Sequence, residues 1–360
     1  MKRLIIDCDP GNGIAGANVD DGLALTLALA APELSLELVT TVAGNTPSAV
    51  GYNVAKDLMA RVGRAIPVVQ GSTRALHEPD APWRDVLDNN VHKHHLAHLW
   101  QDVRPPQVFQ PPALHAADAI GQLICANPGD ITLVAIGPLT NVAMALQRYP
   151  DMAAAVSQIV IMGGVFALDD YIKDTNFGFD PEAAHQVLTS GANITLVPLD
   201  VTTQTLMTHA DLDRIASLGT PLAGFICETF RPWIDYSMAT RGLPGCWIHD
   251  ALVIAWLLDP DLASAAPYHV DVELRAGRTR GKTWRHSLAL RLDVGIAAPA
   301  GKPVNVLKTV DNHRLLALIE RHLGLSTPNR DDKIHMFGAC VMLKRHNLRF
   351  VCMVISRHHE

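Results

Sequence analysis

Four aspartates lie close together in the segment DCDPGNGIAGANVDD, residues 7–21, directly after the first apolar run of the chain. Asp7 and Asp9 are two residues apart, so an extended strand places both side chains on the same face. A Pro-Gly pair then ends the strand, and Asp20 and Asp21 begin the next predicted helix, whose N-terminus favours anions. A helix cap and a solvated turn would explain only two of these four acids. Converging carboxylates are typical ligands of a hard cation, Ca²⁺ or Mg²⁺, and we predict a metal site here.

Two further segments carry groups that suit such a site. In WIHDAL, His249-Asp250 precedes an apolar run and is typical of a helix N-terminus that faces a strand end. In AIGPLTN, residues 135–141, Gly-Pro stops a strand, and the backbone carbonyl of Ile136 is a normal kind of Ca²⁺ ligand. Taken alone, the first segment is better explained as a cap Asp beside a chance His, and the second is an ordinary turn. Because a metal held by the four aspartates would need further ligands, we favour a functional role for His249-Asp250.

The segment DTNFGFDPEAA, residues 174–184, combines a helix start with two possible substrate ligands. Asp180 followed by proline predicts a helix N-terminus at that point. Asp174 and Asn176 lie just upstream and have no evident structural role. We therefore consider these two side chains candidates for hydrogen bonds to a polyol.

Histidines and aromatic residues form two other conspicuous groups. NVHKHHLAH, residues 90–98, resembles a metal tract, and His94 and His98 would share a helix face, but no cysteine or acid pattern accompanies them. A flap with one substrate-facing histidine is the interpretation we favour. Phe230, Trp233 and Tyr236 lie at helical spacing, which is typical of core packing and would also suit a wall against a flat ring.

Apolar runs and helical segments alternate along most of the chain, and they must position these candidates. The pattern predicts an α/β fold with a mainly parallel sheet covered by helices on both faces. Ligands bind such sheets at the carboxyl ends of the strands, which is where the polar candidates lie. Residues 72–115 are rich in His, Pro and Trp and indicate an irregular excursion, whereas residues 201–248 are mostly helical. The strand-like runs are Leu4–Asp7, Leu36–Ala43, Ile66–Gln70, Ile131–Ile136, Gln158–Met162 and Ile194–Leu199.

Composition restricts the class of protein. The 360 residues are 48% hydrophobic and 18% charged, as in soluble globular proteins, and a net charge of −6 argues against a nucleic-acid binder. No apolar run is long enough for a membrane span, so we expect no membrane partner. The six cysteines are scattered, without a CxxC pair, and no signal peptide is evident, so we expect reduced thiols and a cytoplasmic protein. The basic segment 329–360 does not match the rest of the chain, and we assign it no function.

Taken in order, these motifs resemble the nucleoside hydrolases, the inosine–uridine-type nucleoside N-ribohydrolases. Their signature DxDPGxDD, followed by Ala, corresponds to DCDPG and then VDDGLAL in this chain. The resemblance covers about residues 1–327, leaving 328–360 as an atypical tail. It implies a single Rossmann-like domain with a mixed, mostly parallel central sheet, and an enzyme that hydrolyses ribonucleosides to base and ribose. The other matching segments are TTVAGN, LVAIGPLTNVA, IVIMGG, DPEAA, LDVT and HDA.

The resemblance also implies a role for individual residues. Asp9 would act as general base on a water molecule, and either His249 or His92 would protonate the departing base. The family is usually dimeric or tetrameric, so we expect a homodimer or a homotetramer. A single Ca²⁺ would be bound by Asp9, Asp21, Asp250 and the Ile136 carbonyl. The 2′- and 3′-hydroxyls of the ribose would complete its coordination shell. The residues implied to bind the ribose are Asp20, Asn45 and Asn176, with Asp174 at the position of a family glutamate and Asp250 next to the diol.

The chain departs from the family pattern in four places. Eight residues, NGIAGANV, stand between Gly11 and Asp20, where the pattern has one, so they either bulge outward or reshape the sugar site. Gly22 replaces the alanine that follows the acid pair. The family's Glu-Phe-Asn is Asp174-Thr175-Asn176 here. The preceding segment FALDDYIK lacks the Asn that the family uses near the 5′-hydroxyl, so that side of the site is altered. The reaction class is therefore better supported than the identity of the sugar or the base.

Two other functions remain open at this point. A non-catalytic nucleoside- or ribose-binding protein would keep the metal and form no free sugar. A phosphatase of the haloacid dehalogenase type also begins with a strand that ends in DxD and uses Mg²⁺. That family requires Thr or Val two residues after the second Asp, where this chain has Gly11.

Overall fold

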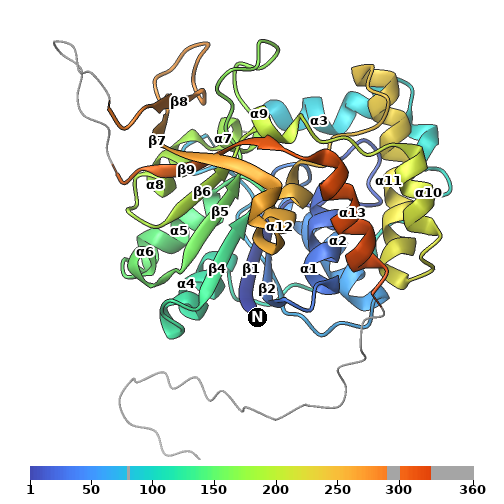
Figure 1. Cartoon of the computed structure of the whole chain (residues 1–360), viewed down its shortest axis with the longest axis horizontal. Helices are drawn as coiled ribbons and strands as arrows, with labels where there is room; N and C mark the ends of the chain where they lie inside the picture. Colours follow the sequence, from blue (N-terminus) through green and yellow to red (C-terminus); the bar gives the residue numbers. More distant parts are fainter. Residues whose placement is uncertain (79–81, 290–300, 326–360) are drawn as a thin grey trace, which may run out of the picture. The chain divides into compact units, whose positions relative to one another are not determined.

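The computed structural model describes residues 1–78, 82–289 and 301–325, and these ranges contain a nine-stranded sheet (Figure 1). The strand order is β3-β2-β1-β4-β5-β6-β9-β7-β8. All neighbours from β3 to β9 pair in parallel, and β7 pairs antiparallel with both β9 and β8. The strands are β1 (Lys2–Cys8), β2 (Leu34–Thr41), β3 (Val68–Gln70), β4 (Ile131–Ala135), β5 (Gln158–Met162), β6 (Ile194–Val197), β7 (Ala263–Val272), β8 (Thr283–His286) and β9 (Val304–Val310).

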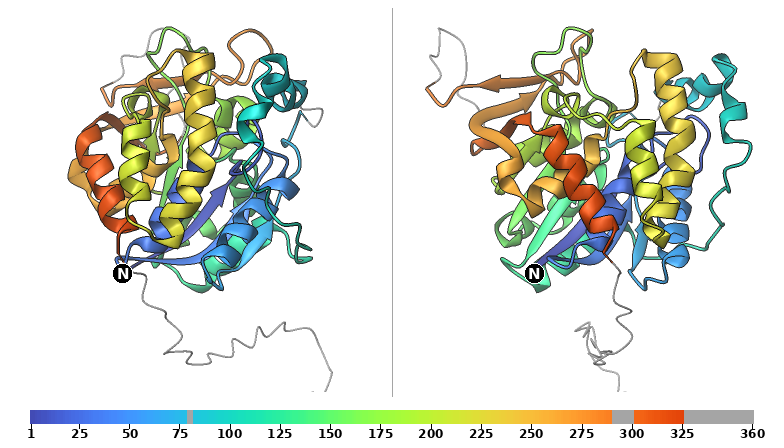
Figure 2. Two further views of the ribbon diagram at one scale, coloured as in Figure 1. Left: turned by 90° about the vertical axis from the view of Figure 1, so that its right-hand side faces the viewer. Right: turned by 45° about the vertical axis from the view of Figure 1, so that its right-hand side comes forward.

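Helices cover both faces of this sheet, as the alternating pattern predicts. On β1, Leu4 and Ile6 pack into the core beneath α1, α11, α12 and α13, whereas Ile5 packs into the core beneath α4, α5 and α8. Helices α10, α11 and α13 lie side by side (Figure 2). The helices are α1 (Asp20–Ala30), α2 (Ser48–Arg61), α3 (Pro82–Lys93), α4 (Ala116–Ala126), α5 (Thr140–Arg148), α6 (Met152–Ala155), α7 (Thr175–Phe179), α8 (Pro181–Leu188), α9 (Leu199–Thr202), α10 (His209–Ala216), α11 (Pro221–Arg241), α12 (His249–Leu258) and α13 (Asn312–Leu323), with 3₁₀ turns at Ala97–Trp100 and Pro260–Leu262.

The predicted fold class is confirmed, and the site lies where the strand order reverses. The chain runs outward from β1 through β2 to β3, and then returns to the other side of β1 to form β4. Helices on opposite faces therefore separate at the carboxyl ends of β1 and β4 and leave a crevice there. Both the segment after β1 and the segment after β4 carry predicted ligands.

Three sequence predictions need comment. Residues 72–115, expected to be irregular, contain the twelve-residue helix α3 and a 3₁₀ turn. His94 and His98 do not share a helix, because α3 ends at Lys93. The segment 328–360 lies outside the described residues, so the predicted boundary at 327 stays a prediction. None of the helices in the described ranges is long and apolar enough to cross a membrane.

Candidate active site

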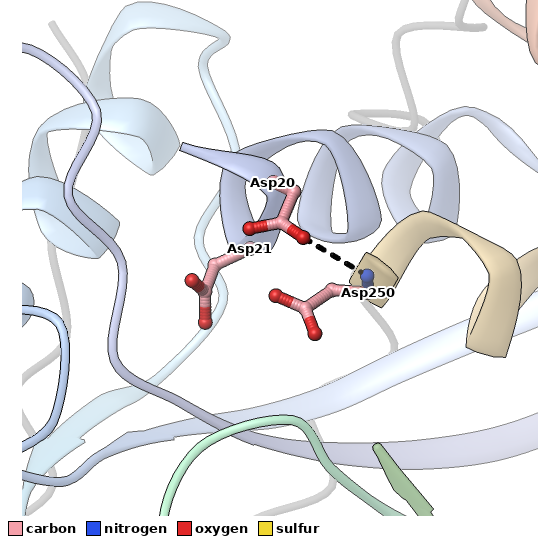
Figure 3. Close-up of side chains that lie close together, drawn as sticks. All are labelled: Asp20, Asp21 and Asp250. Carbon is pink, nitrogen blue, oxygen red and sulfur yellow. Dashed lines mark hydrogen bonds between the residues drawn. The ribbon is translucent and has the colours of Figure 1, made fainter. Parts of the chain in front are cut away.

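Three of the predicted acids converge at the N-termini of two helices. Asp20 and Asp21 are the first residues of α1, and Asp250 is the second residue of α12. Each offers a carboxylate oxygen, and these oxygens lie within 4.8 Å of one another (Figure 3). Asp20 also accepts a hydrogen bond from the backbone N–H of Asp250 at 3.2 Å, which ties the two helix ends together. Helices α1 and α12 pack against each other and thereby hold the acids in place.

Asp9 joins this group from the end of β1. Its backbone N–H donates to Asp21 Oδ1 at 2.9 Å, and its Oδ2 accepts from the backbone N–H of Asn45 at 2.5 Å. The side chain of Asn45 donates to Asp21 Oδ2 at 3.3 Å. A side chain at position 44 would overlap the Asp9 carboxylate, so only Gly44 allows the backbone to approach so closely. We call Asp9, Asp20, Asp21 and Asp250 the acid cluster.

Burial makes the acid cluster electrostatically costly. Its carboxylates are at most 3% exposed, and burial raises the pKa of Asp9 to about 7 and that of Asp20 to about 6. For Asp21 and Asp250, burial and then the neighbouring carboxylates hold the pKa well above the ordinary value. Asp9 Oδ1 and Asp20 Oδ1 accept no hydrogen bond from the residues in the described ranges. A divalent cation would offset this repulsion and satisfy the free oxygens, so the donor set fits a hard metal ion.

The Ile136 carbonyl lies one residue beyond β4, at the same edge of the sheet. It accepts a hydrogen bond from Asn176 Nδ2 at 2.9 Å, and the same amide group donates to the Met162 carbonyl at 3.1 Å. A carbonyl oxygen has two lone pairs, so this contact leaves one free. Asn176 thus links the ends of β4 and β5, which gives it a structural role that the sequence did not reveal.

Asp174 also has a structural role, contrary to our expectation. It is the N-cap of α7, and its carboxylate accepts from the backbone N–H of Phe177 at 3.0 Å. Its Oδ1 is buried and accepts no hydrogen bond from the described part of the chain. Asp180 caps α8 as predicted, accepting from Ala183. A contact between Asp174 and a substrate stays a prediction.

The two candidate histidines occupy very different environments. His249 begins α12 and is buried, with its Nδ1 2.7 Å from Thr202 Oγ1. Burial, and secondarily the charge of Arg241, lowers the pKa of His249 to about 3, so its imidazole is neutral at neutral pH. His92 lies in the last turn of α3 and is exposed. Both residues line the same cavity.

That cavity has a volume of about 720 Å³, a size suited to a small organic ligand. Trp233 and Tyr236 of α11 form one part of its wall, with ring centroids 5.4 Å apart and planes inclined by 23°. Phe230 is instead fully buried in the core. Of the three aromatic residues at helical spacing, one therefore packs in the core and two form cavity wall. Of the predicted site residues, the cavity lining contains Asp20, Asn45, His92, Ile136, Asn176, His249 and Asp250.

The eight residues that stand where the family pattern has one form part of the cavity wall. We call residues 12–19 the inserted loop, and five of its residues, Ile14 to Asn18, line the cavity. Its first residue, Asn12, is buried and donates through Nδ2 to the Val19 carbonyl and to Thr229 Oγ1, each at 3.0 Å. The Asn12 amide occupies the space that a Cβ atom at position 22 would need. The insertion therefore explains Gly22, and these two departures from the family pattern are one structural change.

Arg84 of α3 is a site residue that sequence reasoning missed. Its guanidinium donates to the carbonyls of Gly44 and Asn45, directly behind the peptide groups that contact the acid cluster. The neighbouring Trp83 stacks on Phe179 with ring centroids 3.7 Å apart, which fixes α3 against α7. No local pattern marks this arginine, because the two carbonyls that it binds lie about 40 residues earlier in the chain.

Comparison with known proteins identifies a family to which the chain is similar. Residues 4–317 match the model of the family described as inosine-uridine preferring nucleoside hydrolase. The pyrimidine-specific ribonucleoside hydrolase RihA of Enterobacter sp. (strain 638) is 36% identical over 285 residues, which are 78% of this chain and 86% of the relative.

Two solved structures have a similar fold. A plant nucleoside hydrolase, PpNRh1, superposes with a TM-score of 0.79 at 28% identity, covering 90% of this chain and 99% of that one. The purine-preferring ribonucleoside hydrolase from Gardnerella vaginalis superposes with a TM-score of 0.75 at 28% identity, covering 90% and 98%. The similar proteins thus include one named as pyrimidine-specific and one named as purine-preferring.

Proposed function

The chain belongs to the inosine-uridine preferring nucleoside hydrolase family, and we propose that it uses Ca²⁺ to hydrolyse the N-glycosidic bond of ribonucleosides, releasing base and ribose. The observation that carries the proposal is the acid cluster: four buried carboxylates near the carboxyl ends of β1 and β4, two of which have an oxygen that accepts no hydrogen bond from the described residues. Ca²⁺ fits this donor set better than Mg²⁺, because Ca²⁺ accepts six to eight oxygen ligands, including backbone carbonyls. The ligands would be Asp9, Asp21, Asp250 and the carbonyl of Ile136.

When bound, the cation would fix the ribose diol and lower the pKa of a water molecule. Asp9 is suited to accept the proton of that water through Oδ1, since its Oδ2 is held by the Asn45 N–H. Three residues that line the cavity would bind the ribose hydroxyls: Asp20 of the acid cluster, Asn45 and Asn176. Buried anions at this position also favour the positive charge that develops on the sugar as the bond breaks.

The departing base requires a proton or an equivalent hydrogen bond. His249 reaches the cavity as a neutral imidazole, and Thr202 engages its Nδ1, which leaves the other ring nitrogen to face a ligand. His92 lines the same cavity from α3 and is accessible to solvent. We assign leaving-group assistance to one of these two histidines, and pyrimidine ribonucleosides are the first substrates to test because of the likeness to RihA.

A reducing-sugar assay tests the proposal. Inosine, adenosine, uridine, cytidine and 5-methyluridine are each incubated with the protein, with Ca²⁺ and with a chelator. We expect free ribose from at least one nucleoside and its loss on chelation. Tight Ca²⁺ binding without ribose from any of them would indicate a binding protein instead. The predicted homodimer or homotetramer is checked separately by light scattering.

A further inference from the structure

The inserted loop adds aliphatic side chains to the lining of the cavity. Ile14, Ala15 and Ala17 line it from the loop itself, and all three side chains are aliphatic. The polar lining residue of the loop, Asn18, uses its side-chain oxygen to accept from the backbone N–H of Val19 at 2.8 Å. The loop therefore offers mainly aliphatic surface to a ligand, together with the amide N–H groups of Asn18, and no charge.

Neighbouring elements extend this surface. Pro47 and Val50 line the cavity at the start of α2, and Leu87 lines it from α3. Thr46 Oγ1 donates to the Pro10 carbonyl at 3.1 Å, so the start of α2 lies against the beginning of the loop. We call Ile14, Ala15, Ala17, Pro47, Val50 and Leu87 the apolar annex.

Contacts of the inserted loop place the annex toward the α3 and α11 side of the cavity. Gly16 packs so closely on Val91 of α3 that a Cβ atom there would overlap it, and Asn12 is bonded to Thr229 of α11. Between the same two helices, Asn90 Nδ2 donates to the hydroxyl of Tyr236 at 3.1 Å. The annex thus adjoins the aromatic part of the wall, where a flat nucleobase would lie.

On the premise of the proposed function, we propose that the annex selects ribonucleosides whose base carries an apolar substituent, such as an alkyl group. The polar ribose is bound at the acid cluster, and the base, as the flat and less polar half of the substrate, turns toward the aromatic wall. A substituent on its outer edge then enters a compartment that lacks charged groups on the loop. Burial of each methylene or methyl group there contributes about fourfold to kcat/KM.

Two substrate pairs that differ by one methyl group test this inference: uridine with 5-methyluridine, and adenosine with N6-methyladenosine. For whichever base the enzyme accepts, we expect kcat/KM to be about fourfold higher for the methylated member. The substitution Ile14→Asn makes the annex polar and should bring this ratio to one or below. Because the ratio is measured within one preparation, a partly inactive variant does not distort it.

Ile66→Asn is the matched control, since Ile66 is also a half-buried isoleucine but lies outside the cavity lining. Its ratio should equal that of the wild type. A ratio of one or less in the wild type for both pairs overturns the inference, as does an Ile14→Asn variant that keeps the wild-type ratio. A gain for 5′-deoxy-5′-methylthio nucleosides with none for the methylated bases would assign the annex to the sugar and also overturn it. Absence of any nucleoside turnover would instead refute the proposed function itself.

Discussion

Replacing Gly22 by alanine should destabilise this protein, although alanine is the better helix former. Gly22 is the third residue of α1, and a Cβ atom there would overlap the side-chain amide of Asn12. That amide is held on two sides, by the Val19 carbonyl and by Thr229 Oγ1. It is buried within the structure, so it cannot move aside without losing both hydrogen bonds.

The expected size of the effect follows from three contributions. Alanine in place of glycine stabilises a helix by up to about 1 kcal/mol. Overpacking of a well-packed interior costs about 1–3 kcal/mol, and each lost hydrogen bond costs about 1 kcal/mol. The unfavourable contributions dominate, so Gly22→Ala should lower the free energy of unfolding by about 2–4 kcal/mol.

Urea denaturation of four proteins tests this reasoning: wild type, Gly22→Ala, Asn12→Ala and the double variant. Asn12→Ala should cost about 2 kcal/mol through its two hydrogen bonds, and Gly22→Ala should then cost nothing further, because the space is free. Gly224→Ala in α11 is the control, since a Cβ atom there meets no atom within 4 Å and should stabilise the protein. Additive effects in the double variant would refute the proposed conflict between Asn12 and position 22.

Four further predictions concern the acid cluster and its surroundings. Asp9→Asn should lower kcat by at least about 100-fold, as initial rates will show, and full activity would contradict its role as base. The affinity for Ca²⁺, measured by calorimetry, should fall as the pH is lowered through about 7, because the raised pKa of Asp9 lets protons compete with the ion. A constant affinity between pH 8 and pH 6 would argue against this competition. Of His249→Gln and His92→Gln, one alone should lower kcat/KM by about 100-fold or more, which identifies the group that assists the leaving base; equal losses would refute a single donor. Arg84→Gln should weaken Ca²⁺ binding about tenfold by releasing the Gly44–Asn45 peptides. Arg104→Gln, which loses the ion pair between the half-exposed Arg104 and the buried Asp57, should not weaken it; equal affinities in the two variants would reject a positioning role for Arg84.

The sheet was predictable because its strands are short apolar runs with turn residues after them. Gln158–Met162 was predicted with the bounds that the structure gives, and Leu36–Ala43 differs from β2 by two residues at each end. Helix α3 was missed because it is mostly polar and lies among prolines and histidines. Its position depends on contacts with distant residues, such as the stacking of Trp83 on Phe179, which local patterns do not contain.

The site was predictable in part for a similar reason. The rule that ligands gather at the carboxyl ends of parallel strands was enough to bring Asp9, Asp20, Asp21 and Asp250 together. It does not distinguish a ligand from a structural residue at the same edge, which is why the capping role of Asp174 was not foreseen. The link between the inserted loop and Gly22 was likewise beyond sequence reasoning, since it requires the packed position of Asn12.

The acids of the cluster lie far apart in the sequence, which has a consequence for biosynthesis. Asp250 lies 230 residues after Asp20, with which it shares a hydrogen bond. At a translation rate of about 5–20 residues per second, the early acids are synthesised roughly 10–50 s before their late partner. During that interval the nascent chain has no complete binding site, and a cation that needs both sets of ligands is retained only after α12 has docked against α1. Ion capture would then have to wait until α12 has been synthesised, and a chain truncated before α12 would lack both the metal and the charge balance that holds these buried acids together.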